Sequence, residues 1–559
     1  MTECRAAPQQ DNGNTSPAAN NCERQGVREA PNSGASSRQS REGVSATPLR
    51  KRAARHISVQ DAMRAWFAGE FEQCLELCDA VRLRDSETRT HIALLRARAL
   101  LRLDRGDDAV STLHDVESIP CGTDEALTTR MLLGAAHVRR GNVGEGLALL
   151  ISAQREGNRA HRTIRSEIAL NLGLAYYARR DLTAAERALS LVPNDADLVH
   201  ACAVQYRAWI ALARDNTEQA AASFIAALHA LDACRNYDRF FDANCVRALA
   251  HLGAERLDRE TWAFVRSRRA RIDWSADGLA QPRFFIAYCA AAYQLDVEGN
   301  SLEAAREARE AERLAPSEAY RAQARCKRAA IARHMGEPLS HRDHVESASE
   351  LLAKHDPAEF SGDEKVVPLI LAEELAAIDP DGARAMFALH RELSPLSPAL
   401  SATQTHSTDA YRAAIEAAVL EHAGARDEAL RRYREAFDVL SAAGYTRRAA
   451  MAALRITQLI GDRKFQSYAA RVTSHLSPQS WLRRELVVAT SQNVRLTAVQ
   501  REVLSLICQG KSNPEIARLR KRSLHTIRNL VARLFEILGV SSREELAVQS
   551  VRRGLYTPS

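Results

Sequence analysis

The sequence predicts an all-α protein in which an α-solenoid of paired helices precedes a small four-helix domain. Apolar residues recur at spacings of three and four from about residue 56 to 480, which is typical of amphipathic helices. Within that stretch, a pattern of small and large apolar residues repeats at intervals of 35 to 39 residues. The segment 495–559 then contains three sequences typical of helix starts.

Residues 1–55 are rich in Ser, Asn, Gln, Ala, Gly and Pro and contain almost no aromatic or branched apolar residues. Such a segment buries too little apolar surface to offset the entropy lost on folding, so we expect a disordered N-terminal tail. Its basic end, which includes Arg50, Lys51 and Arg52, suits either weak attraction to phosphate or a solvated tail. We favour the solvated tail.

Residues 56–480 contain the repeated pattern. A small residue is followed twelve positions later by another small residue, and four positions after that by a large apolar one. The copies are Ala97/Ala109/Leu113, Gly134/Gly146/Leu150, Gly173/Ala185/Leu189, Ala208/Ala220/Phe224 and Ala417/Ala429/Tyr433. Two antiparallel helices need small side chains where their backbones approach, and a large side chain fills the gap to the next pair. No copy is placed between about 232 and 280 or between 336 and 400.

The copy that includes Leu172, Gly173, Tyr176, Ala185 and Leu189 resembles a tetratricopeptide repeat. The resemblance implies a tetratricopeptide-like helical repeat domain over 56–480 with a concave groove. Proteins of that family bind peptides, partner proteins or small ligands in this groove. We therefore expect an effector of one of these kinds at the repeat groove.

Metal and disulfide chemistry is not expected. His341 and His344 are three residues apart and suit either a metal half-site or a solvated helix face, and we favour the solvated face because no third ligand stands out. The eleven cysteines contain no CxxC pair, although Cys74 and Cys78 are one helical turn apart. We interpret them as reduced thiols, and we expect no metal and no cofactor.

Four helices are predicted after a linker at 481–494, within a domain at 495–559. Thr497 with Gln500, Ser512 with Glu515 and Ser542 with Glu545 each have the spacing of a capping box. Ser523 is the N-cap of the third helix, which is expected from Leu524 to Leu538. The second and third helices with the short turn between them have the proportions of a helix-turn-helix motif.

The third helix presents polar residues opposite its apolar stripe. Arg528 and Asn529 are candidates for base contacts, because Arg reads guanine and Asn reads adenine in the major groove. Residues suited to phosphate contacts are Lys511, Ser512, Asn513, Ser523, Thr526 and Arg533. The charge of this segment also favours nucleic-acid binding. Residues 494–559 hold 12 basic and 5 acidic side chains, a surplus equal to the net charge of +7 for the whole chain.

These residues resemble a LuxR-type (FixJ-type) helix-turn-helix domain. The matching positions include Leu496, Thr497, Glu502, Val503, Leu504, Gly510, Ser512, Asn513, Glu515, Ile516, Ala517, Ser523, Thr526, Ile527, Arg528, Leu538, Gly539, Val540, Arg543 and Leu546. The resemblance implies that Arg528 and Asn529 touch bases. It also implies that the fourth helix, after Ser542, forms a homodimer contact.

Several positions depart from the LuxR-type pattern. Arg520 and Arg522 replace apolar residues before the third helix, Leu530 replaces a common His, and Ile537 replaces a Lys. These departures affect the prediction of which DNA sequence is recognised. They do not affect the prediction that the domain binds DNA.

Other classes of protein are not supported by the sequence. It contains no GxxxxGK[ST] loop, no alternating strand and helix pattern of a receiver domain, and no catalytic motif such as HExxH or GxSxG. The longest apolar run, from Phe284 to Tyr293, is too short to span a bilayer, and we expect a cytoplasmic protein. The sequence therefore predicts a bacterial-type transcription regulator for double-stranded DNA, and not an enzyme. The alternative is a tetratricopeptide scaffold for protein assembly with a degenerate helix-turn-helix docking module.

Overall fold

The computed structural model describes residues 57–552 and 556, except 83–84, 104, 120, 196, 235–236, 276–277, 357–358, 361, 395–406, 493–495, 539 and 541. Throughout these residues the chain forms helices and no β-strand, which confirms the predicted all-α class. The predicted tail at 1–55 lies outside the described residues.

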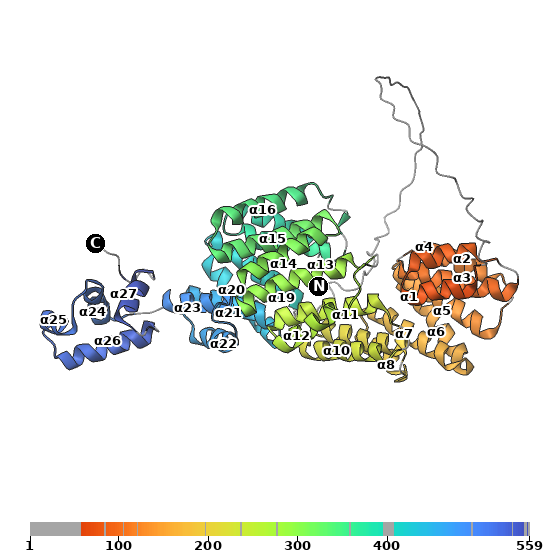
Figure 1. Ribbon diagram of the computed structural model, residues 1–559, viewed down its shortest axis with the longest axis horizontal. Coiled ribbons are helices and arrows are strands. Elements are labelled where there is room, and N and C mark those ends of the chain that lie inside the picture. The colour runs from red at the N-terminus through yellow and green to blue at the C-terminus, as the bar shows by residue number, and fades with distance from the viewer. Residues whose placement is uncertain are drawn as a thin grey trace, which may run out of the picture.

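The first ten α-helices form five consecutive pairs, of which α1–α8 lie at one end of the molecule (Figure 1). They are α1 (Val59–Ala68), α2 (Phe71–Ala80), α3 (Ser86–Arg102), α4 (Gly106–Glu117), α5 (Thr123–Arg139), α6 (Val143–Glu156), α7 (Arg162–Ala178), α8 (Leu182–Ser190), α9 (Leu198–Ala213) and α10 (Thr217–Ala233). A short 3-10 turn, Gly157–Arg159, follows α6. Successive pairs stack on one another, as an α-solenoid requires.

The array continues through the middle of the chain. Its helices are α11 (Arg239–Arg256), α12 (Arg259–Arg269), α13 (Ala280–Tyr293), α14 (Ser301–Leu314), α15 (Glu318–Met335), α16 (Pro338–Ala353), α17 (Val367–Leu375), α18 (Pro380–Leu393), α19 (Ser407–His422), α20 (Arg426–Ala442), α21 (Thr446–Ile460), α22 (Arg463–Thr473) and α23 (Trp481–Gln492). A π-helical turn, Gln294–Glu298, extends α13, and a 3-10 turn, Gly362–Val366, precedes α17.

The repeated small residues lie where paired helices approach most closely. All five predicted copies are buried, and each spans one helix pair. A Cβ atom at Gly134 would lie 2.7 Å from Cγ of Leu150, and one at Gly146 would lie 2.6 Å from the Gly134 carbonyl oxygen. Atoms this close would overlap, so the tight crossing of α5 and α6 requires glycine at both positions.

Helix pairs also occupy the regions where no repeat was placed from the sequence. In the pair α15 and α16, the positions of the pattern are Ala329, His341 and Val345, all buried. The spacing is kept, but a histidine stands where the pattern has a small residue. The repeat was therefore hidden by residue type and not by a change of architecture.

The helical array closes on itself. The hydroxyl of Thr217 at the start of α10 donates a hydrogen bond of 2.9 Å to the carbonyl of Ala443, which lies between α20 and α21. The backbone N–H of Ser477 donates to the carbonyl of Val297 at 3.0 Å. One hydrophobic core accordingly combines buried residues of 169–297 with those of 410–489. The later helices thus pack back on the middle of the array and enclose its concave side.

Most of the segment that the sequence analysis assigned to a linker, 481–494, forms helix α23. Leu482 and Ala489 are fully buried in the main core, and Leu486 packs against it. Spacings of four and three among these residues give an apolar stripe of the kind that docks a helix. The prediction of a linker over this whole segment was wrong, because α23 belongs to the body.

The last four helices form a separate unit at the opposite end of the molecule from α1–α8 (Figure 1). They are α24 (Ala498–Cys508), α25 (Asn513–Leu519), α26 (Leu524–Leu538) and α27 (Arg543–Arg552). Their own core contains Leu496, Val503, Leu504, Ile507, Ile516, Ala517, Ile527, Val531, Leu534, Leu538 and Leu546. A core of its own allows this unit to be considered as a separate domain.

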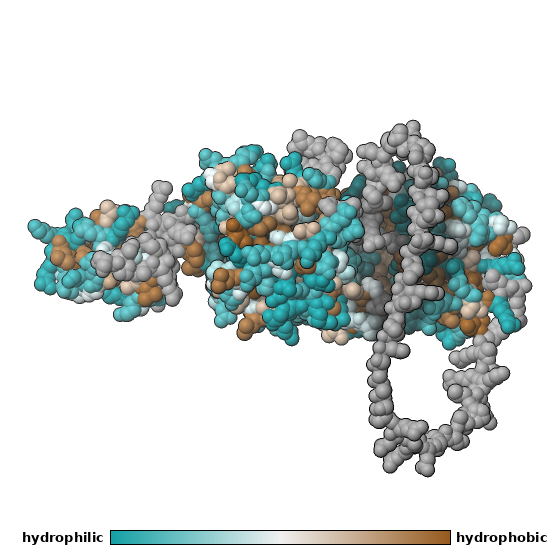
Figure 2. Space-filling model, turned by 90° about the horizontal axis from the view of Figure 1, so that it is seen from above, coloured by the Kyte–Doolittle hydropathy of each residue, from teal (hydrophilic) through white to brown (hydrophobic). Residues whose placement is uncertain are grey.

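The face of the molecule seen in Figure 2 is mainly hydrophilic, with scattered hydrophobic patches. Among the described residues, no helix has the length and apolar character needed to cross a bilayer.

Candidate nucleic-acid interface and central cavity

The helix starts of the C-terminal unit are those predicted from the sequence. Before α24, the Thr497 hydroxyl accepts from the Gln500 N–H at 3.2 Å, and the Gln500 side chain accepts from the Thr497 N–H at 2.9 Å. Before α25, the Glu515 carboxylate accepts from the Ser512 N–H at 2.7 Å. The Ser542 hydroxyl likewise accepts from the Glu545 N–H at 3.0 Å before α27. These caps fix where each helix begins.

The turn between α25 and α26 has a defined geometry. Lys521 has a φ of +49°, a left-handed conformation that reverses the chain after α25. Two residues later, the Ser523 hydroxyl accepts from the Thr526 N–H at 3.1 Å, and the two hydroxyls are 2.8 Å apart. The turn and the cap together set the angle at which α26 leaves α25, as in a helix-turn-helix motif.

Helix α26 has one buried and one exposed face. Ile527, Val531, Leu534 and Leu538 are buried in the domain core. Arg528 and Asn529 are exposed on the other side, as predicted for base contacts. Arg528 has no ion pair among the described residues, so its guanidinium is available to a ligand.

His525 is a polar residue of this face that the sequence analysis did not single out. Its ring Nε2 lies 3.3 Å from the Asn529 side-chain nitrogen, one helical turn away. The spacing of four between His525 and Asn529 was the available signal. His525 therefore orients the amide of a candidate base-contacting residue.

The predicted phosphate contacts divide into free and engaged side chains. Lys511, at the start of α25, is exposed. Asn513 is engaged, because its amide oxygen accepts from Nη1 of Arg543 at 2.9 Å. Arg533 pairs with Glu536 at 3.1 Å on the exposed surface, which leaves it mobile enough to be recruited by phosphate.

A comparison of the sequence with protein families finds one match in this unit. Residues 494–550 match the family GerE, described as bacterial regulatory proteins, luxR family. The C-terminal unit is a LuxR-family helix-turn-helix domain. The residues outside this range are not part of that match.

The structural comparison finds helical proteins of low identity. A Rap protein complexed with competence and sporulation factor is 13% identical, with a TM-score of 0.43, over 72% of this chain and 100% of that one. The apo form of the quorum sensor NprR from B. thuringiensis is 11% identical, with a TM-score of 0.35, over 72% of this chain and 97% of that one. No curated protein sequence matches the chain.

Three of the four departures from the LuxR-type pattern are accommodated inside the LuxR-family domain, whereas Arg522 is exposed. Arg520, in the turn, forms an ion pair with Glu502 of α24 and is directed toward the domain. Leu530 and Ile537 pack partly buried against the domain core. These three side chains therefore contribute to the packing of the domain.

A cavity of about 460 Å³ lies inside the closed helical array. Most of its wall comes from helices α9, α11, α13, α15, α17, α19, α21 and α23, with Tyr433 of α20 and residues of the 3-10 turn before α17. Pockets of this volume hold small organic molecules. Its lining was not predicted, because it combines residues from Trp209 to Glu485, which the fold alone brings together.

The cavity is rich in ion pairs. Glu255 lies 3.6 Å from Arg447 and 3.1 Å from Arg448, and Arg447 also pairs with Asp296. On the other side, Arg333 and Glu374 are 2.9 Å apart. Burial alone would raise the pKa of Glu374, but Arg333 and His341 outweigh it and lower the pKa to about 2.

His341 is buried against the lining residue Glu374 and does not lie on a solvated face. It is 7% exposed, and its Nε2 lies 3.2 Å from the Glu374 carboxylate. The solvated-face interpretation was therefore wrong for His341. His344 instead lies 3.5 Å from Arg325, and no group of three or more potential metal ligands occurs among the described residues.

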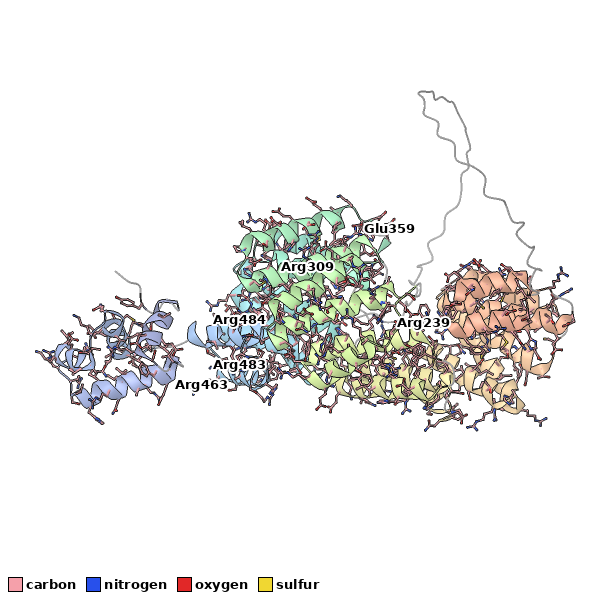
Figure 3. All side chains as sticks on the ribbon, viewed as in Figure 1. Arg239, Arg309, Glu359, Arg463, Arg483 and Arg484 are labelled. Atoms are coloured by element: carbon pink, nitrogen blue, oxygen red, sulfur yellow. The ribbon has the colours of Figure 1, made fainter. Side chains whose placement is uncertain are left out.

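Helix α23 connects the cavity to the LuxR-family domain. Trp481 and Glu485 of α23 line the cavity, and α24 of the domain begins at Ala498. Arg483 and Arg484 of α23 lie at the end of the body that faces the LuxR-family domain (Figure 3). Helix α23 is thus the element that both lines the cavity and directly precedes the LuxR-family domain.

Proposed function

We propose that this protein is a transcription regulator that binds double-stranded DNA through its LuxR-family domain. The observation that carries this proposal is the exposed pair Arg528 and Asn529 on α26, opposite the buried stripe of the same helix. In a helix-turn-helix domain, this face of the second helix of the motif enters the major groove. Arg528 would donate to guanine and Asn529 would pair with adenine.

Phosphate contacts position the domain on the duplex. Lys511, Ser512 and Asn513 lie at the start of α25, and Ser523 and Thr526 lie at the start of α26. Helix N-termini and hydroxyl groups are suited to phosphate oxygens, and Arg533 adds a positive charge. Of these residues, Asn513 retains only its amide nitrogen as a free group, because Arg543 occupies its oxygen.

The helical-repeat body is the part that would sense an effector. Its central cavity has the size of a small-ligand site, and the last helix of the body lines it. An occupant that shifts Trp481 would shift α23, and residues 493–497 are all that separate this helix from α24. The proposed response is a change in how the LuxR-family domain meets DNA.

A homodimer through α27 would match two DNA half-sites. Val548 of α27 is 51% exposed, an apolar side chain on the outer surface of a short helix. Two copies joined at this helix would place their α26 helices about one DNA turn, ~34 Å, apart. A palindromic target site is expected from that symmetry.

Sequence selection from a random duplex library with the full-length protein, followed by titration of the selected site with salt, tests this proposal. We expect enrichment of a short motif. We also expect the logarithm of the association constant to fall linearly with the logarithm of the salt concentration. Affinity that neither depends on salt nor distinguishes sequences would contradict DNA regulation. That result would favour the scaffold alternative, for which chromatin occupancy mapping should give no reproducible sites.

A further inference from the structure

One cation in the central cavity lacks an acidic partner. The five arginines of the lining are Arg247, Arg333, Arg447, Arg448 and Arg455, and each has a carboxylate within 3.8 Å. Lys327 of α15 has no ion pair among the described residues, and its Nζ lies 4.5 Å from the centroid of the Tyr288 ring. A desolvated charge without a counter-ion costs free energy, which a bound anion would recover.

The carboxyl groups whose charges act on Lys327 do not supply that counter-ion. Asp296 is engaged by Arg447. Burial, reinforced by Glu374, raises the pKa of Glu373, which favours its neutral form, and the Tyr411 hydroxyl donates to it at 3.4 Å. Burial also lowers the pKa of Lys327, as expected for an ammonium group that lacks a close anion.

Hydrogen-bond donors without partners surround the same space. Arg247 Nε, Arg448 Nε and Arg448 Nη1 are buried donors of the lining without a hydrogen-bond partner, whereas Glu255 Oε2 and Gln323 Oε1 are unpartnered acceptors. The unpartnered His251 Nε2 donates in only one tautomer of the neutral ring. Unsatisfied buried donors are rare in proteins and commonly mark a place where a ligand or water binds. Their surplus over free acceptors favours an anionic ligand.

Aromatic rings form the rest of the wall. Trp209, Phe285, Tyr288 and Tyr411 line the cavity. The Arg448 guanidinium lies 3.7 Å from the centroid of the Tyr411 ring, and the Arg247 guanidinium lies 5.5 Å from that of Phe285. These rings offer a flat apolar surface next to the donors, which suits a ligand with an aromatic body.

We propose that the cavity binds a compact aromatic carboxylate whose anionic group pairs with Lys327 and whose ring packs on the aromatic wall. One unpaired cation matches one negative charge, which favours a carboxylate over a phosphate dianion. The volume of about 460 Å³ limits the ligand to a small organic molecule. The proposal rests on the effector-sensing part of the proposed function and names the class of ligand.

The test measures binding of phenylacetate and indole-3-acetate to the full-length protein by calorimetry, beside the neutral amides of both acids and inorganic phosphate. We expect the acids to bind roughly tenfold or more tightly than the amides or phosphate. Lys327→Met should weaken acid binding by roughly tenfold or more, and Lys327→Gln should do the same. Lys354→Met is the matched control, because Lys354 is exposed after α16 and lies outside the lining.

Loss of a folded state does not explain the expected result, because removal of an unpaired cation should leave the melting temperature unchanged or raise it. Equal binding of acids and amides, no binding of either acid, tighter binding of phosphate, or an unchanged affinity in Lys327→Met would overturn the proposal. Salt-dependent DNA binding is measured on the same preparations without ligand. It can fail or succeed independently of the carboxylate result, so the two proposals remain distinguishable.

Discussion

The imidazole ring of His334 lies against the indole ring of Trp481, with centroids 3.8 Å apart and planes inclined by 35°. Burial, reinforced by the charge of Arg333, lowers the pKa of His334 well below its usual value, so the ring is neutral at pH 7. His334 belongs to α15 and Trp481 begins α23. This contact joins the cavity wall to the last helix before the LuxR-family domain.

Trp481→Ala should loosen α23 from the body. Removal of this aromatic contact is expected to cost about 2–3 kcal/mol locally, somewhat less than for a fully buried Trp. Backbone amides of α23 should then exchange hydrogen faster in exchange experiments followed by mass spectrometry. If α23 transmits the effector signal, DNA affinity should also become insensitive to ligand.

Val487→Ala is the control for this change. Val487 lies on the same helix but is 51% exposed, so its truncation should leave hydrogen exchange of α23 unchanged. Equal exchange rates in the wild type and Trp481→Ala would show that the stacking contact does not hold the helix.

Gly444→Ala should destabilise the closed array. Gly444 has a φ of +79°, and a Cβ atom there would overlap the Thr217 hydroxyl, which bonds the neighbouring Ala443 carbonyl. The combined strain and overlap should lower the free energy of unfolding by about 3 kcal/mol. Urea unfolding of the full-length protein measures this loss.

Gly424→Ala separates the two contributions. Its φ of +84° is similar, but a Cβ atom would have no neighbour within 4 Å. The loss should therefore be only about 1 kcal/mol, from the backbone conformation alone. If both variants lose the same stability, closure through Thr217 contributes nothing measurable.

The residues that could be predicted from the sequence act over short distances along the chain. The spacing of Gly134, Gly146 and Leu150 identifies a helix pair because both helices are consecutive, and capping residues such as Thr497 act on the next turn. Closure of the array could not be predicted in this way. Thr217 is bonded to a backbone carbonyl 226 residues away, which leaves no signature in residue type.

The cavity was missed for a related reason. Lys327 and Arg448 line the same cavity but come from helices α15 and α21, and in the sequence each is indistinguishable from a solvent-exposed charged residue. Helix α23, unlike the cavity, could have been predicted from the sequence, because the spacing of Leu482, Leu486 and Ala489 gives an apolar stripe. Its period favours the helix that the structure contains over the linker that the sequence analysis assigned.

Arg528→Ala should weaken binding to a selected DNA site by about 1–3 kcal/mol and relax the base preference at one position. The physical reason is the loss of a two-pronged hydrogen bond from an exposed guanidinium to a base edge. The measurement is fluorescence anisotropy on the selected site and on single-base variants of it.

Arg309→Ala provides the control, since Arg309 is exposed on α14 of the body (Figure 3). It removes the same charge from the protein and should change neither affinity nor base preference measurably. A sequence profile of Arg528→Ala that equals the wild-type profile would remove Arg528 from the base-contacting residues.

Acidification should destabilise the body through His251. Burial, with the added effect of Arg448 and Arg247 and against the effect of Glu255, lowers the pKa of His251 to about 4. An unfolded histidine has a pKa of about 6.5, so the unfolded chain takes up a proton first as the pH falls. The stability is therefore fully present above pH 6.5 and declines between pH 6.5 and 4, by about 2 kcal/mol at pH 5.

His251→Gln isolates this contribution because glutamine does not titrate. The difference in free energy of unfolding between wild type and variant should change by about 2 kcal/mol between pH 7.5 and pH 5, with the wild type losing more. His114→Gln, an exposed change on α4, should keep the wild-type profile. A His251→Gln profile parallel to that of the wild type would mean that His251 is accessible to protons in the folded protein. The His251 ring nitrogen at the cavity wall would then be hydrated, and it would contribute less to the binding of an anion.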